Sequence, residues 1–443
     1  MTRLFRWYDY ITFSVFFFGL QALWQTMGLV TPLLVEQFVG EAQKGTYLGT
    51  LRLFSLMFAL LAQSLMGMFS DRNTLPWGRR RPFVAAGTIF ACIFLFMVGF
   101  TAGLEGLAGF WALFVVVILL QVATNTAQAG EQGIIPDLVA EEKRGLFSGV
   151  KALFEIPLPL ILVAFIVGNL VSKEQYWAAL GIVLGALIIS MLLTMLVPEK
   201  PLKEAPSAMD WAAFIRLFLM TLVFTLIILG SGKVVELVSV VLQDITSSAV
   251  IFIVMGLVGL LGMLVAVAMG VWVSVRISLG DSARKNPSFT WWVINRLAFL
   301  VGVVNLSTFA VYFLQARLGY EKAAAAAPAS KLLMFVGIFI LISTVPAGWL
   351  TDRFGEKRMV ATAGMLAVFG TVIALSIPNL TAIFVGACII GIGAGFFYTS
   401  NWALGTLLVP KAEAGRYLGI SNLAGMYRVK WRQQSQKRML IDN

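Results

Sequence analysis

Histidine is absent from the 443 residues of this chain, and other chemically reactive side chains are scarce. Without histidine there is no imidazole to serve as a general base, a metal ligand or a proton relay. The two cysteines, Cys92 and Cys388, each lie inside an apolar run, where a small hydrophobic side chain is expected and a disulfide is not. No nucleophile stands beside a plausible base, and no residues have the spacing of a metal site. The sequence therefore predicts no enzymatic activity, no metal and no cofactor.

Charged residues are also few, at 12% of the chain, whereas about a quarter is usual in soluble domains. Hydrophobic residues make up 59% and gather in runs of about 20 residues, the length that crosses the hydrocarbon core of a bilayer. The leader before the first run is short and basic, and we expect no cleavable signal peptide. These features predict an all-α polytopic membrane protein. Its twelve expected spans begin near Ile11, Tyr47, Phe83, Leu107, Leu146, Tyr176, Trp211, Ser248, Trp291, Lys331, Met359 and Leu380.

The net charge of +11 is distributed unevenly between the loops. Basic clusters fall in alternate loops, at residues 72–81, 143–144, 200–203, 276–285, 353–358 and 411–416. The other loops carry only scattered charges such as Lys44, Lys173, Lys233 and Arg317. Because lysine and arginine concentrate in cytoplasmic loops, this asymmetry predicts a cytoplasmic N-terminus. The dispersal of the basic residues between spans argues against nucleic-acid binding.

One loop motif occurs twice. Residues 67–82 contain Asp-Arg, then glycine, then three arginines, and residues 348–358 repeat the pattern of Asp-Arg, glycine and basic residues. One copy would be weak evidence, since any cytoplasmic loop collects arginine, but both copies lie between two apolar runs. They indicate an internally duplicated membrane protein. The expected gating residues are Asp71, Arg72, Gly78, Arg79, Arg80, Arg81, Asp352, Arg353, Gly355 and Arg358.

A second repeat, at residues 138–149 and 408–419, supports the duplication and suggests the domain boundaries. We expect a six-helix half at 1–200, a linker with two inserted transmembrane helices at 201–288, a second half at 289–425 and a polar basic tail at 426–443. The second half has only four helices, so a truncation near Gly425 that removes the last two is favoured. A natural cytoplasmic tail is the alternative.

The two Asp-Arg-x-Gly-basic loops resemble the signature of the major facilitator superfamily. Residues 60–72, followed by 78–82, are similar to the second helix and loop of the sucrose–proton symporters and their bacterial relatives, near the glycoside–pentoside–hexuronide:cation symporters. Residues 19–21, Trp24 and residues 31–32 add to this likeness, as do Asn125, Gln128 and Asp137. The resemblance implies a major facilitator fold, alternating access and cation-coupled transport of a sugar or glycoside.

The chain departs from that branch where coupling chemistry is expected. Gln121 and Gln132 stand where the plant-type sucrose symporters carry an aspartate and an arginine. Asn401 stands where bacterial relatives often carry an acidic residue. These substitutions remove the usual proton-binding carboxylates and argue against simple proton symport of sucrose.

Two other carboxylates are candidates for coupling. Glu155 lies about ten residues into the fifth span, before Pro157 and Pro159, which would open the backbone hydrogen bonding there. Glu131 lies near the cytoplasmic end of the fourth span, where a solvated position at the interface is expected. Ionisable residues within the bilayer are expensive, which makes both functional candidates.

Three arginines lie within a few residues of a span end and are expected to extend to the interface: Arg52, Arg216 and Arg296. Amides and aromatic rings within the spans suit the hydroxyl groups and the C–H face of a sugar. The candidate substrate-binding residues are Gln21, Trp24, Gln25, Asn125, Gln128, Asn305, Tyr398, Asn401 and Trp402. Packing between helices through polar side chains is the alternative for each.

In the superfamily, the loop aspartates hold the helices of the opposite half. By that resemblance Asp352 would contact residues 148–149, and Asp71 would contact a helix after Gly419 that this chain lacks. The favoured function is cation-coupled transport of a small polar solute through the plasma membrane, driven by protons or sodium ions, by a monomer in the lipid bilayer. The alternatives are an exporter of drugs or lipophilic compounds, and a truncated remnant that does not transport.

Overall fold

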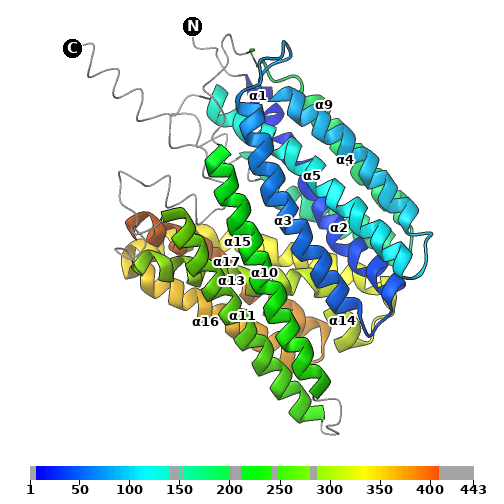
Figure 1. The fold of residues 1–443 in the computed structure, drawn as a ribbon, viewed down its shortest axis with the longest axis vertical. Helices are drawn as coiled ribbons and strands as arrows, with labels where there is room; N and C mark the ends of the chain where they lie inside the picture. The colour runs from blue at the N-terminus through cyan, green and yellow to red at the C-terminus, as the bar shows by residue number, and fades with distance from the viewer. Residues whose placement is uncertain are drawn as a thin grey trace. The chain divides into compact units, whose positions relative to one another are not determined.

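The computed structural model describes residues 6–139, 150–151, 153–199, 201, 211–241, 248–279 and 287–408, which form helices and short connections without a β-strand (Figure 1). The longer α-helices are α2 (Val15–Val39), α3 (Lys44–Asp71), α4 (Arg81–Thr101), α5 (Gly106–Leu138), α9 (Tyr176–Thr194), α10 (Trp211–Val241), α11 (Ser248–Leu279), α13 (Pro287–Thr308), α15 (Ala326–Phe354), α16 (Glu356–Ser376) and α17 (Leu380–Leu408). The shorter elements are α1 (Trp7–Thr12), α7 (Pro157–Leu162), the π-helix η2 (Val163–Val167), α8 (Gly168–Ser172), α14 (Ala310–Leu318) and the 3₁₀-helix η3 (Lys322–Ala325).

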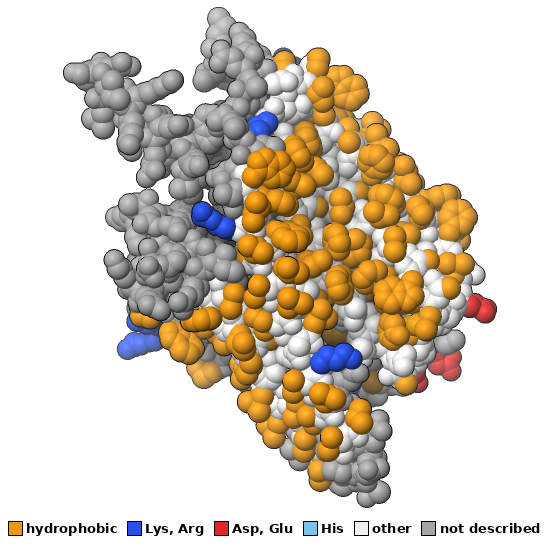
Figure 2. Space-filling model, viewed as in Figure 1, with side chains coloured by type: hydrophobic (Ala, Val, Ile, Leu, Met, Phe, Trp, Pro, Cys, Tyr) orange, Lys and Arg blue, Asp and Glu red, His pale blue; other side chains and the backbone are white. Residues whose placement is uncertain are grey.

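Eleven helical segments of the described residues are long and apolar enough to cross a membrane. They correspond to eleven of the twelve predicted spans. The span predicted near Trp291 falls on α13, whose apolar stretch, Thr290–Val303, is shorter. Hydrophobic side chains cover much of the described face in Figure 2, as expected where lipid tails take the place of water. The prediction of an all-α multi-pass membrane protein is confirmed.

The chain divides into two compact units, Met1–Ala208 with Val303–Ser400, and Met209–Gly302 with Asn401–Asn443. In the first unit, α2 packs against α3, α5 and α9, α4 packs against α5 and α9, and α15 packs against α7, η2 and α8. In the second unit, α10 packs along α11. The boundaries expected from the sequence, with an insertion at 201–288, stay a prediction.

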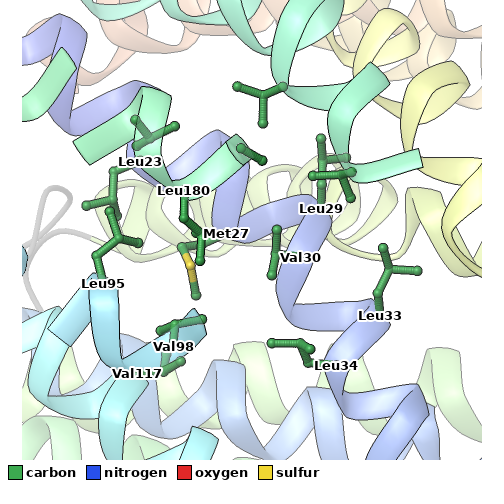
Figure 3. Close-up of a cluster of buried hydrophobic side chains, with 14 of the residues drawn as sticks. Leu23, Met27, Leu29, Val30, Leu33, Leu34, Leu95, Val98, Val117 and Leu180 are labelled. Carbon is green, nitrogen blue, oxygen red and sulfur yellow. The ribbon is translucent and has the colours of Figure 1, made fainter. Parts of the chain in front are cut away.

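One side of α2 forms the core of the first unit. Leu23, Met27 and Val30 meet Leu95 of α4 and Leu180 of α9 in Figure 3, and all five are almost fully enclosed. The backbones of α2 and α9 come close together at Gly19, where a Cβ atom would overlap Ser190 and Leu187 of α9. Small residues allow backbones to come this near in a membrane bundle.

The opposite side of α2 is polar. At 100° per residue, Gln21, Gln25, Gly28 and Pro32 form one stripe on the side of the helix away from Gly19. A Cβ atom at Gly28 would meet nothing within 4 Å, so this stripe borders open space. The apolar face therefore fixes the helix in the core and leaves its amides available on the other side.

Candidate functional site

The side-chain amides of α2, at Gln21 and Gln25, do not bond the described helices to one another. Gln21 and Gln25 are partly buried, and neither side chain makes a hydrogen bond to any described residue. Trp24, beside them, packs against the core of the first unit and is also partly buried. Unbonded amides within a membrane span are costly unless something else satisfies them. These three predicted residues therefore remain candidates for contact with a polar ligand.

A second polar stripe runs along α5, where Gln121, Asn125, Gln128 and Gln132 recur at the spacing of one helix face. The Asn125 amide donates to the Gln121 side-chain oxygen at 3.0 Å and to its carbonyl at 2.8 Å. Gln128 is partly buried, and among the described residues its amide has no hydrogen bond. At the end of the stripe, Gln63 of α3 donates to Gln132 at 3.1 Å.

Glu131 is buried, with 1% of its surface exposed. This corrects the expectation that it is solvated at the interface. Among the described residues neither of its carboxylate oxygens has a hydrogen-bond partner. The Lys151 ammonium and the Glu199 carboxylate are close enough to interact with it electrostatically. A carboxyl group placed in this way is costly to the fold and indicates a functional role.

Glu155, the other predicted coupling residue, is linked to the same lysine. The Lys151 Nζ lies 2.8 Å from the Glu155 Oε2 and 4.3 Å from the centre of the Phe17 ring on α2. The helix is interrupted at Ile156, immediately before Pro157, where α7 begins. Lys151 thus stands between the two carboxylates that the sequence singles out.

A polar cluster, the Lys44 cluster, joins α14 to α2 and α3. The Lys44 Nζ is 3.1 Å from Glu36 and 3.0 Å from the Gln315 oxygen, while the Gln315 amide donates to Glu36 at 2.9 Å. Lys44 also lies 4.7 Å from the centre of the Tyr312 ring, and the Tyr312 hydroxyl donates to the Pro32 carbonyl at 2.6 Å. Lys44 was expected to be a scattered loop charge, and the structure shows instead a largely buried ion pair.

Arg52 lies on α3 about two turns beyond Lys44. Its Nε atom is enclosed without a hydrogen-bond partner, and its guanidinium interacts electrostatically with Tyr312 of α14. The side chain therefore points toward α14 and does not extend to the interface as expected.

At the other end of α3, Arg80 is the centre of a second cluster, the Arg80 cluster. Its guanidinium lies 2.6 Å from Asp71 and 2.8 Å from Asp137, and donates to the Ser70 hydroxyl at 3.1 Å. The side chain is almost enclosed, at 7% exposure. Burial alone would lower the pKa of Arg80, but Asp137 and Asp71 together raise it above its ordinary value. Arg80 stays charged and ties the ends of α3, α4 and α5 together.

The N-terminus of α4 is capped from a distant part of the chain. Glu199 accepts hydrogen bonds from the backbone N–H groups of Arg80, at 2.7 and 2.8 Å, and of Arg81, at 3.1 Å. Gly78 has a φ of +114°, and a Cβ atom there would overlap the Glu199 side chain. The motif glycine is required for both reasons.

The remaining motif residues have local contacts. Arg79 lies 2.8 Å from Asp71, and Arg72 donates to the Met68 carbonyl at 3.1 Å. In the second motif Asp352 and Arg358 are exposed, and Gly355 ends α15 with a φ of +85°. Arg353, also exposed, lies 5.6 Å from the ring centre of Trp349. The partners expected at 148–149 and after 419 lie outside the described residues.

In the second unit, the predicted substrate-binding residue Asn401 contacts Arg296. The Arg296 guanidinium donates to the Asn401 side-chain oxygen at 3.1 Å, and Trp292 donates to the Asn401 carbonyl at 2.9 Å. Arg296 is buried and does not extend to the interface as expected, whereas Arg216 is exposed.

Three predicted residues add little to the site. Tyr398, in the first unit, is 39% exposed. Asn305 lies on α13 and Trp402 on α17, but their side chains are outside the described part of the structure.

Comparison with known proteins finds similarity to one superfamily of membrane proteins. The model of the Major Facilitator Superfamily matches residues 275–427. The fold is similar to the crystal structure of a D-xylose–proton symporter, with a TM-score of 0.58 and 15% identity over 95% of this chain and 87% of that one. It is also similar to a peptide transporter POT in complex with sulfate, with a TM-score of 0.63 and 14% identity over 96% and 88%. The family match thus covers about a third of the chain, and the two solved structures show that the fold is of the same kind.

Among curated proteins, the chain is similar to sucrose transport proteins. It is 28% identical over 144 residues to sucrose transport protein SUC4 of Arabidopsis thaliana, which is 28% of this chain and 26% of that one. It is 26% identical over 107 residues to sucrose transport protein SUT1 of Oryza sativa subsp. japonica. The chain spans about a fifth of the length of the latter. Both of these relatives are named as sucrose transport proteins, and the similarity to them is confined to part of the chain.

Sequence reasoning missed the partners that hold the site together. Lys151 and Glu199 each lie in or near a basic stretch where charge is expected for topology alone. Glu36, Gln315 and Arg52 each lie near a span end, where an exposed position is the usual expectation. Two signals were available: the i,i+4 spacing of Lys151 and Glu155, and the helical spacing of Arg52 and Gln63, which places both on the same face of α3.

Proposed function

We propose that the chain is a secondary active transporter that moves a small polar solute by alternating access. The observation that carries the proposal is the pair of polar stripes in one packed unit, on α2 and α5. The side-chain amides of Gln21, Gln25 and Gln128 in these stripes have no hydrogen bond to any described residue. Solute hydroxyl groups match such amides, since each amide both donates and accepts hydrogen bonds. Among the similar proteins are sucrose transport proteins and a D-xylose–proton symporter, which supports a sugar or glycoside as the solute.

Coupling is proposed at Glu131. The buried carboxylate is more stable when a proton or another cation neutralises it, because a bare charge in the bilayer is costly. When the cation leaves, Lys151 is the nearest compensating charge, and it would be drawn away from Glu155. Cation binding at Glu131 and the Lys151–Glu155 ion pair are then linked, which is what symport or antiport requires.

The proposed setting is the plasma membrane, with the N-terminus in the cytoplasm. The basic loops at 72–81 and 353–358 then lie on the cytoplasmic side, in agreement with the positive-inside rule. The Arg80 cluster lies at the cytoplasmic end and the Lys44 cluster at the external end. In this orientation the polar stripes of α2 and α5 connect the two ends.

The test is uptake by the purified full-length chain in proteoliposomes. Labelled sucrose, xylose and a simple glucoside are offered under an inward proton gradient, an inward sodium gradient, and no gradient. We expect accumulation of at least one solute under one gradient, and its loss when an ionophore removes that gradient. Absence of uptake and of counterflow for every polar solute tested would overturn the proposal.

A further inference from the structure

Arg52 is a charged side chain in a candidate membrane span, and no described residue pairs with its charge. It lies about 12 Å along α3 from Lys44, inside a span of Lys44–Asp71. Among the described residues no carboxylate pairs with it and no acceptor receives its N–H groups. Its guanidinium interacts electrostatically with the neutral Tyr312. Buried arginines are normally paired, because removing a charge from water costs several kcal/mol.

The nearby negative charge is already engaged. Glu36 accepts from Lys44 at 3.1 Å and from Gln315 at 2.9 Å, so the Lys44 cluster is complete without Arg52. The Tyr312 hydroxyl donates its proton to the Pro32 carbonyl at 2.6 Å. A satisfied ion pair thus lies near an arginine for which no described residue supplies a counter-ion.

The face of α3 that carries Arg52 borders open space. A Cβ atom at Gly45 or Gly49, on the same side of the helix, would meet nothing within 4 Å. Gln63, on the same face, reaches the α5 stripe through Gln132. Through Tyr312, Arg52 also lies close to Pro32, which belongs to the open stripe of α2. The arginine, the α2 stripe and the α5 stripe therefore lie around one region of the first unit.

We propose that Arg52 is the counter-ion of a carboxylate on the solute, and that the transported class is a small polyhydroxylated acid. The guanidinium binds the carboxylate with two parallel N–H···O bonds, and the amides of the two stripes bind the hydroxyl groups. This inference rests on the proposed function and narrows its solute from a neutral sugar to a sugar acid. It gives the arginine a partner only when the solute is present.

The test compares two solutes that differ at one carbon. Gluconate and sorbitol are open-chain polyols of equal length, with a carboxylate and a CH₂OH group respectively at one end. Binding to the full-length protein in nanodiscs is measured by calorimetry for wild type, Arg52→Gln, Arg52→Lys and the control Arg216→Gln, which changes an exposed arginine. We expect wild type to bind gluconate at least tenfold more tightly than sorbitol.

The variants separate ligand binding from a structural role. Arg52→Gln should abolish the preference for gluconate, Arg52→Lys should keep part of it, and Arg216→Gln should keep all of it. Arg52→Gln should also melt at or above the wild-type temperature, because it removes a charge with no partner in the fold. A lower melting temperature for Arg52→Gln, or an equal preference in wild type and Arg52→Gln, would overturn the inference.

Transport assays distinguish the failure of this inference from the failure of the proposed function. Gradient-driven uptake of a neutral sugar, with no competition by gluconate, would overturn the inference and leave the proposed function intact. Tight gluconate binding without uptake or counterflow of any solute would overturn the proposed function and leave Arg52 as an anion-binding residue.

Discussion

At the scale of single residues, Gly78 shows how the loop motif depends on backbone geometry. Its positive φ and the nearness of Glu199 leave no room for a side chain. Gly78→Ala is expected to cost about 1–3 kcal/mol and lower the melting temperature. Gly67→Ala is the control, because Gly67 lies in α3 with open space at its Cβ position. Equal melting temperatures for the two variants in detergent would contradict this reading.

Arg80 is the residue whose loss should disturb the bundle most. Arg80→Gln removes the more buried of the two arginines that pair with Asp71 and Asp137, and Arg79 is left as their partner. Removing one side of a buried ion pair costs about 3–5 kcal/mol. Arg79→Gln is the milder comparison, since Arg79 is more exposed. Thermal unfolding should rank wild type above Arg79→Gln and Arg79→Gln above Arg80→Gln. The reverse order of the two variants would show that Arg80 is not the centre of this cluster.

At the scale of elements, the Lys44 cluster holds α14 against α2 and α3. Lys44→Gln removes the charge that Glu36 faces and weakens this connection. We expect faster hydrogen exchange in α14, residues 310–318, of Lys44→Gln than of wild type. Lys173→Gln, in an exposed loop position, is the control and should leave α14 unchanged. An unaltered exchange rate in Lys44→Gln would mean that other contacts hold α14.

The sequence predicted the positions of the helices well. It did not show which side of each helix faces lipid and which side faces protein. Apolar runs of about 20 residues locate spans such as α4 and α9, because backbone groups in a bilayer must be hydrogen-bonded within the helix. The same runs cannot tell lipid from protein, since both surroundings are apolar. Glu131, Arg52 and Lys44 were therefore expected to be exposed, and only their tertiary neighbours show that they are enclosed.

The candidate site was predicted only in part, because the sequence does not show which side chains meet between helices. Gln21 and Gln25 share a helix face by spacing alone, and the structure shows that no described residue bonds to them. Lys151 lies four residues before Glu155, a spacing that favours an ion pair on one helix face. Its nearness to Glu131 gives no signal in the sequence, because those two residues come from different segments of the chain. Contacts between distant segments depend on the packing of whole helices.

At the scale of the whole molecule, the proposed carrier binds solute and cation through different residues. In this proposal the amides of α2 and α5 would bind the solute, and Glu131 would bind the cation. Loss of the carboxylate should therefore separate the two processes. Glu131→Gln keeps the size of the side chain and removes its negative charge, and Glu105→Gln, at an exposed loop position, is the matched control.

The most direct test is uptake by proteoliposomes containing wild type, Glu131→Gln or Glu105→Gln, with and without an inward cation gradient. The account predicts that wild type and Glu105→Gln accumulate solute against its gradient. Glu131→Gln should still exchange solute across the membrane in counterflow but should not accumulate it. Gradient-driven accumulation by Glu131→Gln at the wild-type level would contradict the account.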